Sequence, residues 1–295
     1  MRRVLKISLP FNLIKRILLA AAGLVFLFAL LLFGKTTTIK ADFPHTEQSL
    51  PAFNIEAAIT KEKQHLSPDQ LMYVSNLENK ISRGDVKKQS KDQLEQLATF
   101  WKDSVGAFVP YAYYLSTAAK LDNSEKKLTF AAHLILENMR REDSVELKAW
   151  EAETAASLFE SALKLDPDND DLKIGLGSCY VYGQGMIGDP QQTMKGIQRL
   201  LEVVRKDSNN MQAQLVLGIG AVISRQYDKG IERLNKVVSF DPHNLEAVSW
   251  LADAYAGEGD KMNAIKWYQQ SKHLVNNPVF SKEIDERIKA LNTEP

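Results

Sequence analysis

One pattern of small and bulky residues repeats along the C-terminal half of the 295-residue chain. Three rows of positions share the same spacing, one longer step followed by two equal shorter steps: one row is small, one is bulky, and one is mostly small and apolar. A period of about 34 residues, the length of the shorter step, predicts antiparallel helix pairs stacked into a solenoid, because no single pair can bury its apolar face alone. The rows are Ala155, Gly196, Gly230 and Ala264; Phe159, Leu200, Leu234 and Tyr268; and Ala162, Val203, Val237 and Ser271.

The two most regular repeats, residues 211–244 and 245–278, resemble the tetratricopeptide repeat. The resemblance implies a small residue wherever the two helices of a pair approach most closely, since a larger one would force them apart. Gly230 stands where the family prefers Ala, and it should weaken its helix by ~1 kcal/mol. The matching residues are Leu217, Gly218, Tyr227, Ile231, Leu234, Asp241 and Pro242 in the first unit, and Trp250, Leu251, Tyr255, Gly259, Asp260, Ala264, Ile265 and Tyr268 in the second.

The resemblance implies an all-α, right-handed tetratricopeptide solenoid and sets the expected divisions of the chain. Residues 170–278 hold three units, the first lengthened by an insertion that lies within 182–190. Residues 85–169 hold degenerate helix pairs, and residues 53–84 form two N-terminal helices. Residues 279–295 form an amphipathic helix, which we interpret as the polar cap that the last repeat of a solenoid requires. The expected residues of close helix approach are Gly177, Gly196, Gly218, Gly230, Ala252 and Ala264.

An uncharged apolar run occupies residues 17–34, ahead of the repeats. The run is just long enough for a membrane-spanning helix, which needs roughly 17–25 residues. Residues 1–16 carry five basic residues and no acidic one, so the positive-inside rule predicts a cytoplasmic N-terminus and repeats on the periplasmic side of the cell (inner) membrane. Residues 35–52 are polar and would form a tether. The alternative is a cleaved signal peptide, although the residues before Ala41 make a poor cleavage site.

The remaining chemistry of the chain points away from catalysis and from nucleic acid. The formal net charge is zero, and no basic stripe of the kind that binds nucleic acid is present. Gly183-x-Gly185-x-x-Gly188 has the letters of a dinucleotide fingerprint, but it follows a predicted helix instead of a strand. We therefore interpret it as a flexible insertion between helices. The five histidines are scattered, and Cys179 is expected to be buried, so we expect no metal, no cofactor and no small-molecule substrate.

The resemblance also implies where partners bind, because tetratricopeptide proteins line a concave face with their first helices. Its apolar middle row and acidic edges would suit an amphipathic helix or an extended basic peptide. An alternative is that residues 54–81 of the same chain fill this groove. The eleven positions are Asp171, Ile174, Ser178 and Tyr182; Gln212, Leu215, Ile219 and Val222; and Glu246, Ser249 and Asp253.

The order of anchor, tether and repeats resembles membrane-anchored tetratricopeptide proteins of bacterial envelopes. Segments 100–104 and 176–180 are similar to a group of such proteins found in Bacteroidota. The resemblance implies a membrane-tethered scaffold that binds other proteins or peptides. A chaperone-like binder of unfolded secreted chains is the alternative, and no catalytic constellation in the sequence supports an enzyme.

Overall fold

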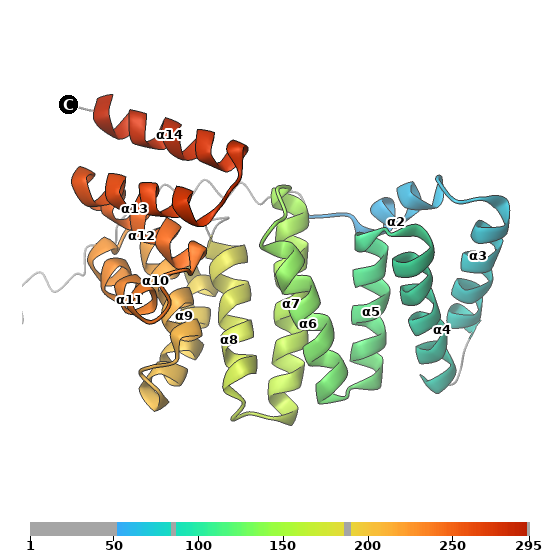
Figure 1. Cartoon of the computed structure of the whole chain (residues 1–295). Coiled ribbons are helices and arrows are strands. Elements are labelled where there is room, and N and C mark those ends of the chain that lie inside the picture. The colour runs from blue at the N-terminus through green and yellow to red at the C-terminus, as the bar shows by residue number, and fades with distance from the viewer. Residues whose placement is uncertain (1–51, 84–86, 186–189, 294–295) are drawn as a thin grey trace, which may run out of the picture. The chain divides into compact units, whose positions relative to one another are not determined.

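The computed structural model of the protein describes residues 52–83, 87–185 and 190–293, and over these residues every regular element is a helix (Figure 1). Residues 1–16, 17–34 and 35–51, which include the predicted anchor, lie outside the described part. None of the described helices is both long enough and apolar enough to cross a membrane. The helices are α2 (Ile55–Lys63), α3 (Pro68–Arg83), α4 (Lys87–Phe100), η1 (Trp101–Val105), α5 (Phe108–Asp122), α6 (Glu125–Met139), α7 (Val145–Leu165), α8 (Asp170–Ser178), η2 (Cys179–Gly185), α9 (Pro190–Lys206), α10 (Met211–Ile223), α11 (Tyr227–Phe240), α12 (Leu245–Glu258), α13 (Lys261–Leu274) and α14 (Pro278–Thr293), where η1 and η2 are π-helical.

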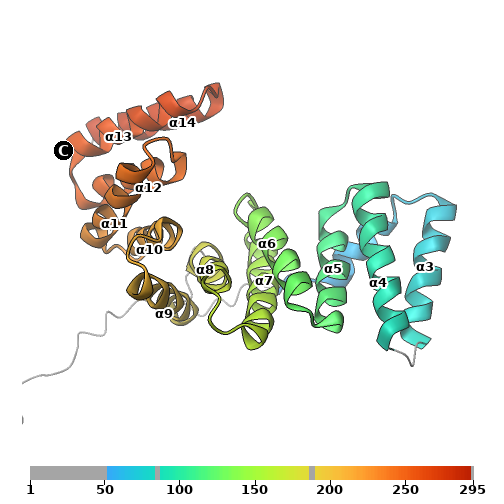
Figure 2. The ribbon, with the colours of Figure 1, turned by 60° about the horizontal axis from the view of Figure 1, so that its bottom comes forward.

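Consecutive helices pack as pairs, and each pair packs on the next. The pairs are α4–α5, α6–α7, α8–α9, α10–α11 and α12–α13, and packing of α5 on α6, α7 on α8, α9 on α10 and α11 on α12 joins successive pairs. Figure 2 shows the same succession from a second direction. The described part of the chain is therefore an all-α solenoid of tetratricopeptide type, as the repeat predicts.

Glycine permits the close approach of α10 to α11. A Cβ on Gly218 would lie 2.8 Å from Leu234 Cγ, and one on Gly230 would lie 2.8 Å from Val222 Cγ2. In the next pair, Ala252 of α12 is fully buried at the equivalent position. Side chains larger than these would have to displace a packed neighbour, which explains the row of small residues in the sequence.

Asparagine begins the first helix of each C-terminal pair. The side-chain oxygens of Asn169, Asn210 and Asn244 accept hydrogen bonds from backbone N–H groups three residues ahead, at 3.2, 2.9 and 2.9 Å. Asparagine is among the best N-cap residues because it satisfies one of the free N–H groups of the first turn. The three caps keep the spacing of the repeat rows, and they are a signal of the helix starts that the small and bulky rows alone do not reveal.

The N-terminal helices α2 and α3 extend the stack. Ile59, Val74 and Leu77 share one hydrophobic cluster with Leu97 of α4 and the fully buried Trp101 of η1. Figures 1 and 2 both place α3 beside α4. These helices therefore do not fill a groove along α8, α10 and α12, which removes the alternative that residues 54–81 occupy it.

The insertion in the first C-terminal unit is partly helical, contrary to our expectation of a flexible segment. Residues Cys179–Gly185 continue α8 as a π-helical turn that packs against α7 and α9. Gly183 is buried, and a Cβ there would lie 2.2 Å from the Cβ of Ala152. Close packing against α7 thus orders this part of the insertion, whereas residues 186–189, including Gly188, lie outside the described part.

Candidate protein-binding surface

The eleven predicted groove residues lie on α8 with η2, on α10 and on α12, but they differ in access to solvent. Since α10 packs against both α8 and α12, a ligand on this face would contact only the less buried side chains. Ser178 illustrates the burial, because its hydroxyl donates to the backbone oxygen of Ile174 at 2.8 Å. Ile174, Ser178, Ile219 and Val222 are buried; Tyr182, Leu215, Glu246, Ser249 and Asp253 are half-buried; and Asp171 and Gln212 are exposed.

Three polar side chains from distant parts of the sequence meet on this face: Arg140, Tyr182 and Glu246, called the inner cluster below. The Tyr182 hydroxyl donates to Glu246 Oε1 at 2.9 Å, and Arg140 Nη2 donates to Glu246 Oε2. The Arg140 guanidinium also lies over the Tyr182 ring, with its carbon 4.7 Å from the ring centroid. The inner cluster therefore joins the end of α6 to η2 and to the start of α12.

Burial makes the electrostatics of the inner cluster stronger than those of a surface ion pair. Burial, followed by the charge of Glu246, raises the pKa of Tyr182 above its usual range. The tyrosine therefore stays protonated and remains a hydrogen-bond donor to the carboxylate. The side chains of Arg140 and Glu246 are 35% and 27% exposed, so water screens their attraction less than it would in an open pair.

Two predicted acidic positions are engaged within the chain. Asp171 lies 3.0 Å from His133 Nε2. Asp253 accepts a hydrogen bond from the Tyr268 hydroxyl at 2.5 Å and one from Arg287 Nη1 of α14 at 2.8 Å. These contacts make the two aspartates part of the packing between helices. Gln212, Leu215 and Ser249 are the predicted positions best placed to meet a partner.

The repeat pattern gave no indication of Arg140, the basic member of the inner cluster. Arg140 lies just after α6, in the segment around residues 140–146 that has no counterpart in the regular repeats. Arg140 therefore has no equivalent position in the regular repeats from which a role could be predicted. Only the fold brings it to Glu246, far along the chain.

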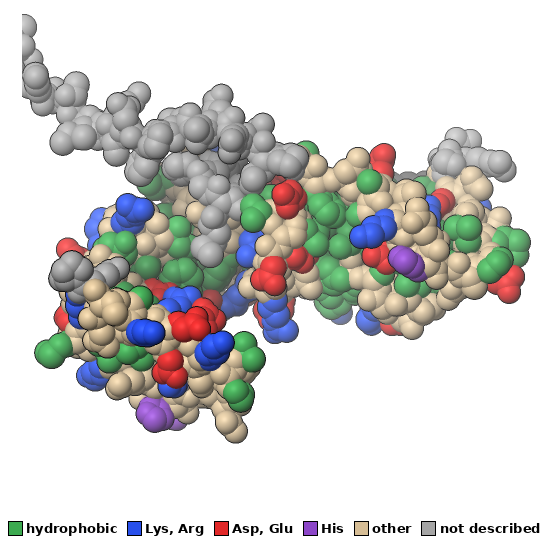
Figure 3. Space-filling model, turned by 90° about the horizontal axis from the view of Figure 1, so that it is seen from above, with side chains coloured by type: hydrophobic (Ala, Val, Ile, Leu, Met, Phe, Trp, Pro, Cys, Tyr) green, Lys and Arg blue, Asp and Glu red, His purple; other side chains and the backbone are tan. Residues whose placement is uncertain are grey.

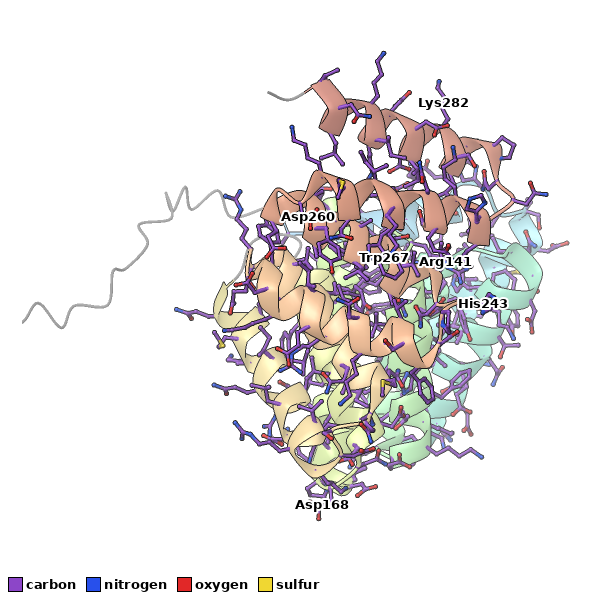
Figure 4. All side chains as sticks on the ribbon, turned by 60° about the vertical axis from the view of Figure 1, so that its left-hand side comes forward. Arg141, Asp168, His243, Asp260, Trp267 and Lys282 are labelled. Atoms are coloured by element: carbon purple, nitrogen blue, oxygen red, sulfur yellow. The ribbon has the colours of Figure 1, made fainter. Side chains whose placement is uncertain are left out.

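The possible metal ligands of the described residues are dispersed. Among them, no group of three or more His, Cys, Asp or Glu side chains could hold a metal ion. Figure 4 shows Asp168, His243 and Lys282 at separate places on the surface. Cys179 is fully buried, and burial raises the pKa of its thiol, which is typical of an unreactive core cysteine.

Comparison with known proteins gives structural neighbours and no match to a family model or a curated protein. A crystal structure of MamA is 19% identical, covers 63% of this chain and 92% of its own, and has a TM-score of 0.44. The structure of YrrB, a TPR protein with an unusual peptide-binding site, is 16% identical with a TM-score of 0.43, covering 80% of this chain and 100% of its own. TTC0263, a thermophilic TPR protein in Thermus thermophilus, is 14% identical with a TM-score of 0.49, covering 69% of this chain and 100% of its own.

At these identities and TM-scores the neighbours carry no argument about function. The chain carries its own sequence repeat and a matching succession of helix pairs. These define a tetratricopeptide-type solenoid.

Proposed function

We propose that this chain is a membrane-tethered tetratricopeptide scaffold that binds proteins or peptides on the periplasmic side of the inner membrane. Residues 17–34 would be the anchor and residues 35–52 the tether. The observation that supports binding is the face of α10 and α12 beside the inner cluster. On these two helices Gln212 is exposed, Leu215 and Ser249 are half-buried, and the carboxylate of Glu246 is partly buried.

The character of this face favours a basic, amphipathic segment as its ligand. Leu215 offers an apolar contact, and Glu246 offers a carboxylate that is already hydrogen-bonded by Arg140. An Arg or Lys of a partner would compete with Arg140 for that carboxylate, since both make charge-assisted hydrogen bonds. Solenoids commonly use such extended faces for binding. The proposal assigns no catalytic step to the chain.

Photo-crosslinking of the full-length protein in cells tests the scaffold. A photoreactive residue at Gln212 or Ser249 should capture one partner in stoichiometric amount. The same residue at Gln269, exposed on α13, is the matched control and should not capture it. Capture of many unrelated unfolded chains at Gln212 would instead identify a chaperone-like binder. Equal capture at Gln269 would refute binding at α10 and α12.

Cysteine labelling tests the membrane topology separately. Cys179 is the only cysteine and is fully buried, so an introduced cysteine would be the main reactive thiol. In cells stripped of any outer membrane, Ser239→Cys on α11 should react with a membrane-impermeant maleimide. Ser8→Cys should react only after the inner membrane is permeabilised. Reaction of Ser8→Cys in intact cells, or recovery of a chain that lacks residues 1–41, would refute the anchor.

A further inference from the structure

A cavity of about 770 Å³ lies between α3 and α4 and reaches the start of η1. We call it the α3–α4 groove. The groove lies on α3, α4 and η1, whereas the inner cluster lies at α6, η2 and α12, so the two are separate surfaces. The residues of the lining that matter below are Asp69, Tyr73, Asp92, Glu95, Phe100 and Asp103.

Aromatic rings form an apolar part of the α3–α4 groove. The rings of Tyr73 and Phe100 are in contact, with centroids 5.4 Å apart. Tyr73, which lines the groove, is 42% exposed, and Phe100 is half-buried. Figure 3 shows hydrophobic side chains next to acidic ones over α3, at the right-hand end of that view. Solvent-accessible aromatic rings with a polar rim are typical of an interaction site.

The charge around the α3–α4 groove is negative. Four carboxylates line it, and within the described part of the chain no Lys or Arg side chain does. Glu95 is paired with Lys127 at 2.6 Å, and Asp103 lies 3.6 Å from the exposed Lys102. A neighbouring cavity of about 370 Å³ shares Glu95 and Asp103 and includes both lysines. The acidic surface of the groove therefore includes Asp69 and Asp92, and it ends at Glu95 and Asp103, which lie beside Lys127 and Lys102.

We infer that the α3–α4 groove docks a segment of a partner protein in which Lys or Arg residues alternate with aromatic or aliphatic ones. The apolar side chains would rest on Tyr73 and Phe100. The basic side chains would lie among Asp69, Asp92 and Asp103. Charge complementarity selects this occupant. An acidic segment would meet four carboxylates, and a neutral apolar one would cover Asp69 and Asp92 without offering them a hydrogen-bond donor.

A labelled peptide tests the inference on the full-length chain in a non-ionic detergent. The probe is a fluorescein-labelled twelve-residue peptide of alternating Lys and Leu with one Trp, followed by fluorescence anisotropy. The triple variant Asp69→Asn, Asp92→Asn and Asp103→Asn should weaken binding at least ten-fold. A matched triple of exposed aspartates elsewhere, Asp143→Asn, Asp168→Asn and Asp228→Asn, changes the net charge equally and should weaken it less than two-fold.

Further measurements exclude non-specific attraction. The peptide with Glu in place of Lys, and the peptide with Ser in place of Leu, should both bind at least ten-fold more weakly. Raising the salt from 50 to 300 mM should also weaken binding several-fold, since exposed charges are screened. Equal weakening by the two triple variants would overturn the inference, and so would unchanged binding in the groove variant once circular dichroism shows that it is folded.

Benzoylphenylalanine at position 96, an exposed residue in the lining of the groove, tests which segment occupies it. In the presence of the peptide it should crosslink to the peptide. A crosslink to residues 1–16 of this chain, which are also basic, would overturn the assignment to a partner and identify the chain's own N-terminus as the occupant. Because these measurements use neither α10 nor α12, their failure would leave the proposed scaffold function untouched.

Discussion

The regular pair α10–α11 and the longer unit α8–η2–α9 differ in how the first helix ends and leads to the second. In the regular pair the first helix is α-helical from Met211 to Ile223, and a short turn leads to α11. In the longer unit α8 is α-helical only from Asp170 to Ser178 and then continues as the π-helical η2 to Gly185. The added residues thus lengthen the first helix before the chain reaches α9.

The difference shows how an insertion can create a contact that the regular repeat lacks. A π-helical turn takes up extra residues without ending the helix, and such turns occur frequently at functional sites. Here η2 contains both Tyr182, which bonds Glu246, and Gly183, which packs on Ala152. The extra turn therefore connects this unit to α7 on one side and to α12 on the other.

The largest expected effect is the loss of the close contact between η2 and α7. In Gly183→Ala the new Cβ would lie 2.2 Å from Ala152 Cβ, which cannot rotate away. We expect a loss of about 3 kcal/mol in the free energy of unfolding, because the backbone must shift. Gly220→Ala in α10 is the matched control: its Cβ would lie 3.4 Å from Val181, and it should change stability by less than about 1 kcal/mol.

Denaturant unfolding followed by circular dichroism measures both glycine variants. Equal stability of Gly183→Ala and Gly220→Ala would show that η2 is not packed as described.

The second expected effect concerns Glu151, a fully buried acid of α7 next to Ala152. Asn138 donates to its Oε1 at 2.8 Å, whereas Oε2 has no hydrogen-bond partner among the described residues. Burial raises the pKa of Glu151 from 4.5 to about 7, and the Asn138 hydrogen bond opposes the shift. Between these values the unfolded chain releases the proton while the folded chain keeps it. Stability should therefore fall as the pH rises from 4.5 to 7.

Glu151→Gln removes this titration and can keep the hydrogen bond with Asn138. Wild type should lose about 2–3 kcal/mol relative to the variant between pH 4.5 and 7.5, since one pKa unit corresponds to about 1.4 kcal/mol. Thermal unfolding at a series of pH values measures the difference. Glu153→Gln, an exposed acid on the same helix, is the control and should follow wild type. Parallel pH profiles for wild type and Glu151→Gln would refute the buried titration.

The third expected effect is the coupling of Arg140 to Glu246. A double-mutant cycle of Arg140→Met and Glu246→Gln should give a coupling free energy of about 1–2 kcal/mol. The pair is partly buried, and both residues contact Tyr182. The control cycle uses Arg141 and Glu137, an exposed pair within one stretch of chain at 2.7 Å, and should give less than about 0.5 kcal/mol. Equal coupling in the two cycles would show that the inner cluster does not join α6 to α12.

The sequence predicts the elements that follow its periodicity and misses those that depend on distant contacts. The rows that contain Gly230 and Leu234 identify the helix pairs, because their spacing reflects contacts repeated within each pair. The helical state of η2 was missed, because glycines such as Gly183 are typical of loops and the sequence does not show that Gly183 packs on Ala152. Arg140 could not be assigned, because no local pattern encodes its contact with Glu246. Ile219 was predicted to line the groove from its position in the repeat, but it is fully buried, and that burial depends on how neighbouring pairs pack.

The smallest expected effect is shared by both kinds of unit, because the same asparagine cap begins α8, α10 and α12. Replacing Asn169, Asn210 or Asn244 by Ala should each cost about 1 kcal/mol in the free energy of unfolding, while replacement by Asp should cost much less. Asn209→Ala, exposed just before α10, is the control and should change stability by less than about 0.5 kcal/mol. Similar losses at Asn169 and Asn244 would show that the longer unit begins as the regular one does and differs only from η2 onward. A negligible loss at Asn169 alone would extend the difference between the units to the start of α8.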